Sequence, residues 1–160
     1  YFKKAGHVVM ASSNAHVRYN PDGTINGENS YIHIIEQARK ATERSYAPFS
    51  GFRVGAAARL RSGRIIIGAN RESEGYPSGL GAERALLFSH QANCADDAIE
   101  AIAIASSPAP RECYPCGACR QTLIDGERRQ GQSIRVIMAG EESATVVESA
   151  ELLLPFTFKL

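Results

Sequence analysis

The chain has 160 residues, of which 44% are apolar and 22% are charged, and its formal net charge is +1. This length suits a single domain with a sizeable buried core. The balanced charge, the lack of a basic run and the absence of Trp argue against a nucleic-acid partner, and no apolar run approaches the roughly 20 residues that a membrane-spanning helix needs.

The N-terminal stretch 1–28 is weakly patterned, with one short edge strand expected at Val8-Val9-Met10. It begins without Met and lacks the apolar region of a signal peptide, so we expect a trimmed, cytoplasmic protein. The first strong pattern is a helix over residues 29–46, in which apolar residues recur at helical spacing. Ala47-Pro48 ends that helix, because proline disfavours the helical conformation of the residue before it.

The rest of the chain alternates strands and helices. Residues 53–60 and 65–69 predict a β-hairpin around a turn that contains Gly63. The later elements are expected as a loop at 70–81, a helix at 82–91, a strand at 99–105, a helix at 117–129, strands at 134–139 and 145–148, and a final turn at 150–154. This order predicts one α/β domain over residues 1–160, a three-layer α-β-α sandwich whose mixed five-stranded sheet has helices on both faces.

The cysteines provide the first chemical signal. Cys113, Cys116 and Cys119 fall within seven residues, whereas Cys94 is distant in the sequence. Such close spacing is typical of a metal-binding or catalytic cluster rather than of a disulfide framework. Cys116-x-x-Cys119 at a helix start suits half of a tetrahedral zinc site, a redox dithiol or inert packing. A thioredoxin-type motif needs a strand directly before its cysteines, and here a Pro-rich loop precedes them, which favours metal.

Glu83 provides the second signal. On its own, an acidic residue in the first turn of a helix simply complements the helix dipole. Here a P-C-x-x-C sequence follows it across one predicted strand. The two helix starts can then face each other at one end of the sheet, where open α/β sheets bind ligands. A glutamate followed by P-C-x-x-C also matches zinc deaminases, in which a His or Cys two residues before the glutamate is a ligand.

Several ordered stretches together resemble the cytidine deaminase family, in its small homotetrameric zinc-dependent form. They are Tyr46-Ala47-Pro48-Phe49-Ser50, Gly68-x-Asn70-x-Glu72, Ala82-Glu83-Arg84, Pro115-Cys116-Gly117-x-Cys119-Arg120-Gln121 and Leu153-Leu154-Pro155-x-x-Phe158. The resemblance implies hydrolytic deamination of cytidine or deoxycytidine to uridine or deoxyuridine plus ammonia, in pyrimidine salvage, with Zn²⁺ as the cofactor. It also implies a small pyrimidine nucleoside as the ligand and a homotetramer or dimer as the assembly.

The resemblance assigns roles to individual residues. Glu83 would shuttle protons, while Cys116 and Cys119 would ligate zinc. Asn70 and Glu72 would hold the ribose hydroxyls. The remaining implied roles are packing near the base for Phe52, backbone contacts with the pyrimidine edge for Ala82 and Cys116, part of a neighbouring subunit's pocket for Phe158, and charge compensation beside the thiolates for Arg84 and Arg120.

Gly81 departs from the family pattern, which has a Cys or His at this position. Glycine has no donor atom, whereas catalytic zinc usually has three protein ligands and a water. Cys113 is the best candidate for a substitute ligand, because Tyr114-Pro115 lets the chain bend toward the site. Two hypotheses therefore stay open: a zinc-dependent deaminase of weakened activity, and a metal-poor nucleoside-binding relative that keeps the fold.

Overall fold

The computed structural model describes residues 3–4, 7–8, 14–18 and 30–160. Its helices are α1 (Ser30–Ala41), α2 (Ala82–Asn93) and α3 (Gly117–Gln130), with the 3₁₀ turns η1 (Thr42–Arg44) and η2 (Ala150–Leu153). Its strands are β1 (Lys3–Lys4), β2 (His7–Val8), β3 (Asn14–Arg18), β4 (Arg53–Leu60), β5 (Ile65–Ala69), β6 (Ile99–Ser107), β7 (Arg135–Ala139) and β8 (Ser143–Val147). Within these ranges, every helix is too short or too polar to cross a membrane.

The five predicted strands form the mixed sheet, and β3 adds a sixth strand at its edge. The strand order is β3-β8-β7-β6-β4-β5. The β6–β7 pair is parallel, and the other described neighbours in this sheet are antiparallel. Of the edge strand predicted at Val8-Val9-Met10, Val8 lies in β2 and pairs with Lys3 of β1. Val9 and Met10 lie outside the described residues.

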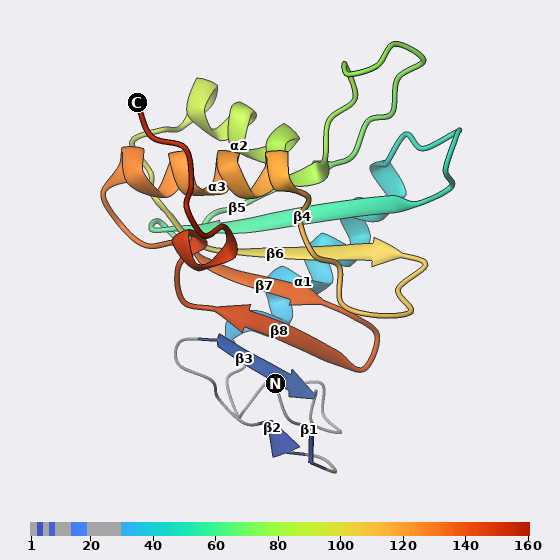
Figure 1. Cartoon of the computed structure of the whole chain (residues 1–160), viewed down its shortest axis with the longest axis horizontal. Coiled ribbons are helices and arrows are strands. Elements are labelled where there is room, and N and C mark those ends of the chain that lie inside the picture. Colours follow the sequence, from blue (N-terminus) through green and yellow to red (C-terminus); the bar gives the residue numbers. More distant parts are fainter. Residues whose placement is uncertain (1–2, 5–6, 9–13, 19–29) are drawn as a thin grey trace.

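Helices cover both faces of the sheet, as predicted (Figure 1). Ala57 of β4 packs in the apolar cluster that contains Ile34 of α1. Its neighbours Ala56 and Ala58 belong instead to the cluster that contains side chains of α2 and α3, such as Leu86. Successive residues of a strand point to opposite faces, so α1 lies on one face and the α2–α3 pair on the other.

The close approach of α1 to β4 depends on Gly55. A Cβ on Gly55 would lie only 2.1 Å from the carbonyl oxygen of Ala38 in α1. No side chain fits at that distance, so a glycine is needed where the helix crosses the strand. The lack of a side chain at Gly55 therefore lets α1 pack closely on the sheet.

The helix predicted to reach Tyr46 ends earlier, at Ala41, and continues as η1. The prediction is wrong at this end because Tyr46 is extended and bonds to the loop after β5. Its N–H donates to the carbonyl oxygen of Asn70 at 3.0 Å, and its own carbonyl accepts the N–H of Glu72 at 2.8 Å. These bonds place the segment before β4 beside the loop after β5, where the candidate site lies.

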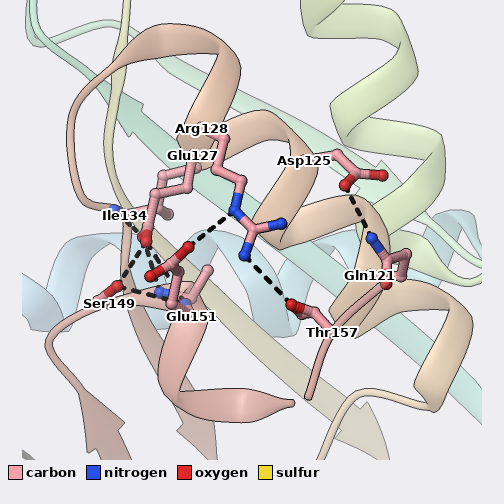
Figure 2. A network of polar contacts seen from close by, with 9 residues as sticks. Gln121, Asp125, Glu127, Arg128, Ile134, Ser149, Glu151 and Thr157 are labelled. Atoms are coloured by element: carbon pink, nitrogen blue, oxygen red, sulfur yellow. Dashed lines mark hydrogen bonds and ion pairs between the residues drawn. The ribbon is translucent and has the colours of Figure 1, made fainter. Parts of the chain in front are cut away.

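Glu127 ties the end of α3 to the chain on both sides of the β7–β8 hairpin (Figure 2). Its buried carboxylate accepts the N–H groups of Ile134 and Ala150, each at 2.7 Å, and the hydroxyl of Ser149. Ser149 also caps η2, since its hydroxyl oxygen accepts the N–H of Glu151. One carboxylate thus satisfies backbone groups of two separate segments.

Candidate active site

The starts of α2 and α3 lie close together, as the spacing of the two motifs predicts. Glu83 is in the first turn of α2 and is 3% exposed. Cys119 is in the first turn of α3, and its thiol donates to Oε2 of Glu83 at 3.4 Å. Residues that are far apart in the sequence therefore form one buried acid–thiol contact.

Burial raises the pKa of the Glu83 carboxyl, because water no longer solvates the charged form. Three weaker influences oppose that shift: the Glu83 backbone N–H, the Cys119 thiol and the charge of Arg84. A carboxyl that keeps its proton closer to neutral pH is suited to general acid and base catalysis. Glu83 therefore has the environment that a proton-transfer group needs.

The cysteines of this region differ in exposure. Cys116 is the N-cap residue of α3 and is exposed, whereas Cys113 and Cys119 are buried. Burial raises the pKa of Cys119, and the charge of Glu83 acts in the same direction. Burial also raises the pKa of Cys113 to about 11. The surroundings of these two buried thiols therefore favour their protonated form.

A cavity of about 670 Å³ collects most of the predicted site residues. Its volume lies within the range of small-molecule sites. Of the predicted residues, those that line it are Phe52, Asn70, Glu72, Gly81, Glu83, Arg84, Cys113, Cys116 and Cys119. It is also lined by Tyr76 and Tyr114, which sequence reasoning missed because loop residues carry no periodic signal.

Three predicted residues lie outside the lining of this cavity. Ala82 is fully buried at the start of α2, and Phe158 is 70% exposed near the C-terminus. Arg120 donates to the carbonyl oxygens of Pro115 (2.8 Å) and Leu153 (2.9 Å). Arg120 therefore fastens the loop before α3 to the C-terminal turn.

Asn70 and Glu72 hold the segment that leads into β4. Asn70 Oδ1 accepts the N–H of Val54 at 2.8 Å, and Asn70 Nδ2 donates to the carbonyl oxygen of Phe52 at 3.0 Å. Glu72 Oε2 accepts the N–H groups of Phe49 (2.8 Å) and Ser50 (3.2 Å), while Oε1 accepts the Ser50 hydroxyl. The two side chains therefore shape one wall of the cavity.

Replacing Glu72 with alanine is expected to free the Phe49–Ser50 backbone. The hydrogen bond from the Ser50 hydroxyl, above all, lowers the pKa of Glu72. The carboxylate is therefore ionised at pH 7 and holds the Phe49–Ser50 segment. It releases the segment only when the pH falls through that lowered pKa and the carboxylate becomes protonated. Amide exchange at Phe49 and Ser50, measured at pH 7 by mass spectrometry, should accelerate at least about threefold as these charge-assisted bonds disappear. Exposed Glu74 provides the matched control, since Glu74→Ala should leave both amides unchanged.

The residues around Gly81 do not fit a catalytic zinc ion. A Cβ at Gly81 would lie 2.6 Å from Cys119 Sγ and 3.0 Å from Glu83 Oε2, so the thiol and the carboxylate occupy the space beside the missing side chain. Across the described ranges, no group of three or more His, Cys, Asp or Glu residues could hold a metal ion. Cys113 lines the cavity but does not complete such a group. Two thiols thus remain where catalytic zinc usually has three protein ligands.

Sequence comparisons identify the relatives of the chain. A family model described as the cytidine and deoxycytidylate deaminase zinc-binding region matches residues 28–130. A cytidine deaminase of Halalkalibacterium halodurans is 37% identical over 92 residues, which are 58% of this chain and 68% of that protein. A probable cytidine deaminase of Dictyostelium discoideum is 30% identical over 125 residues, which are 78% of this chain and 80% of that protein.

Solved structures agree with these matches. Cytidine deaminase from Burkholderia pseudomallei superposes with a TM-score of 0.72 at 34% identity, covering 81% of this chain and 99% of that chain. The enzyme from Mycobacterium tuberculosis superposes with a TM-score of 0.66 at 27% identity, covering 83% of this chain and all of that chain. The predicted fold and the family resemblance are therefore confirmed. The chain belongs to the family of cytidine and deoxycytidylate deaminases, hydrolases that act on carbon–nitrogen bonds.

Proposed function

We propose that the chain binds cytidine or deoxycytidine in the 670 Å³ cavity and deaminates it hydrolytically at a reduced rate. The observation that supports this most is the placement of Glu83. Its buried carboxyl lines the same cavity as Phe52, Asn70 and Glu72, so a proton-transfer group and polar binding groups share one pocket.

The binding end of the proposed site is built around Asn70 and Glu72. An ionised carboxylate has more acceptor positions than the three bonds that Glu72 already accepts, so it can also accept a ribose hydroxyl. Phe52 is 41% exposed and offers an aromatic surface to a pyrimidine ring. We assign the pyrimidine edge to backbone groups at the helix starts, Ala82 and Cys116, as the family resemblance implies.

The chemistry of the proposed reaction falls mainly to Glu83. Hydrolysis joins the oxygen of water to ring carbon C4 and breaks the exocyclic C–N bond, so that ammonia leaves. Glu83 takes a proton from the water and passes it to ring nitrogen N3. It then takes the proton of the hydroxyl now bonded to C4 and gives it to the departing amine. In relatives with three metal ligands, zinc makes the water more acidic. We assign no step to a metal in this chain, which is why the expected rate is reduced.

Replacing Glu83 with glutamine tests this assignment. The amide cannot accept and return a proton, so uridine formation from cytidine should fall by at least about 100-fold. Cytidine affinity, measured by calorimetry, should change little because the variant keeps the shape of the side chain. Wild-type turnover that survives in Glu83→Gln would contradict the role of Glu83, whereas lost affinity with normal turnover would contradict the assigned pocket.

A second candidate function is nucleoside binding without turnover. It is favoured by one observation, that Cys119 Sγ fills the space beside Gly81 where the family pattern has a ligand. This candidate predicts cytidine binding with no uridine after long incubation at high protein concentration.

Self-association of the chain is also part of the proposal. Phe156 and Phe158 are exposed beside the C-terminus, and exposed apolar surface of this kind is suited to contact with a second copy of the chain.

A further inference from the structure

Cys116 and Cys119 lie in the cavity as two free thiols of unlike exposure, one exposed and one buried. They are the N-cap residue and a first-turn residue of the 14-residue helix α3. We propose that these two thiols form a reversible disulfide by exchange with a small disulfide of the glutathione class. This activity is separate from nucleoside turnover, so the failure of either leaves the other standing.

No third metal-binding side chain joins this pair among the described residues, which leaves both thiols free to react. A zinc site of three or four ligands would hold both sulfurs on the metal. In this chain the position two residues before Glu83 is Gly81, and no group of three metal-binding side chains exists among the described residues. The amino-acid sequence left open whether the C-x-x-C motif binds metal or is a redox pair. The structure therefore favours the redox interpretation.

The two thiols differ in their access to solvent, since Cys116 is exposed and Cys119 is buried. Exposed Cys116, at the start of α3, can be reached by a small disulfide that enters the cavity. Cys119 is 1% exposed, so an external disulfide cannot reach it directly. Its position three residues after Cys116, on the same helix face, suits it to attack a disulfide formed at Cys116.

The neighbouring residues hold the Cys119 side chain in place. Its thiol donates to Glu83 Oε2 at 3.4 Å. The missing Cβ at Gly81 leaves room for this arrangement, since that atom would lie 2.6 Å from Cys119 Sγ. Glu83 and Gly81 thus act as positioning residues for the second sulfur.

The exchange balances in two steps. The sulfur of Cys116 attacks oxidised glutathione, forming a mixed disulfide and releasing one glutathione thiolate, which takes up the Cys116 proton. The sulfur of Cys119 then attacks the Cys116 sulfur, releases the second glutathione and gives up its proton to it. The chain loses two electrons and two protons, and one oxidised glutathione becomes two reduced molecules.

The test uses the full chain as purified without chelator, with its zinc content measured first. The chain is incubated in mixtures of oxidised and reduced glutathione, and free thiols, intact mass and disulfide-linked peptides are then measured. With equal concentrations of the two forms, about half or more of the chains should lose two thiols and carry the Cys116–Cys119 link. Failure to lose these thiols, or one equivalent of bound zinc that prevents the loss, would overturn the proposal.

Three variants show which sulfur carries out each step of the exchange. Cys119→Ser should stop at a glutathione adduct on Cys116, because the second sulfur is missing. Cys116→Ser, at an exposed position, should form neither the adduct nor the link at this site. Cys94→Ser should behave as the wild type, since Cys94 lies outside the cavity lining. A link that involves Cys113, or a wild-type reaction that ends at the adduct, contradicts the assigned pair even if Cys119→Ser does not fold.

Discussion

Replacing Gly81 with cysteine is expected to raise the zinc content of the purified chain from below about a tenth of an equivalent to about one. The new Cβ would lie 2.6 Å from Cys119 Sγ, so that sulfur must turn away from residue 81. Three thiolates would then surround one space, next to Glu83. Zinc content by atomic absorption and the thiolate-to-metal absorption of added Co²⁺ would measure the change.

The same variant should increase cytidine turnover by more than about 100-fold, because even the outer-shell partners of a metal ligand change activity 10- to 100-fold. Gly81→Ala is the matched control: it adds the same Cβ beside Cys119 but no donor atom, and it should bind no zinc. A wild-type chain that already holds one equivalent of zinc would contradict our description of the site. A Gly81→Cys chain that binds zinc but leaves cytidine unchanged would place the loss of activity elsewhere in the pocket.

Much of the fold can be predicted from the sequence because strong local patterns mark its central elements. The apolar runs of β4 and β5 flank a turn with Gly63, and both strands have the predicted bounds. The stripe of α1 contains Tyr31, Ile34 and Ile35, which all pack on the sheet. Periodicity of this kind needs no knowledge of distant residues.

The errors arise where distant residues decide the structure. β3 joins the sheet only through β8, and an edge strand of this kind has no continuous apolar run to identify it. Tyr46 leaves the helix because its backbone bonds to the loop after β5, which comes more than twenty residues later. Neither pairing has a signal in the local sequence.

In the candidate site too, some features follow from local sequence motifs and others depend on distant residues. The residue types of Glu83, Cys116 and Cys119 could be selected from their motifs, and the structure brings all three into one cavity. The bonds of Asn70 and Glu72 to the backbone before β4 could not be predicted, because they depend on the three-dimensional path of both segments. The position of Cys119 Sγ beside Gly81 depends on packing and had no sequence signal.

Glu127 is a buried polar residue that links α3 to neighbouring segments. Its side chain is 6% exposed and accepts the backbone N–H groups of Ile134 and Ala150. These groups lie before β7 and after β8, so the carboxylate joins α3 to both ends of a hairpin (Figure 2). A buried N–H group that loses its acceptor costs about 1–3 kcal/mol.

Glu127→Ala is therefore expected to lower the free energy of unfolding by about 3–5 kcal/mol, since it leaves two buried N–H groups and the Ser149 hydroxyl without this acceptor. The melting temperature should fall by roughly 10 °C. Glu151 provides the matched control, because its 2.7 Å ion pair with Arg128 lies at the surface with the Glu151 side chain 50% exposed. Glu151→Ala should cost at most about 1 kcal/mol. Urea unfolding of both variants measures the difference, and equal losses would show that the buried carboxylate has no special role. Glu127→Gln should lie between the two, because its amide keeps one acceptor oxygen but not the second.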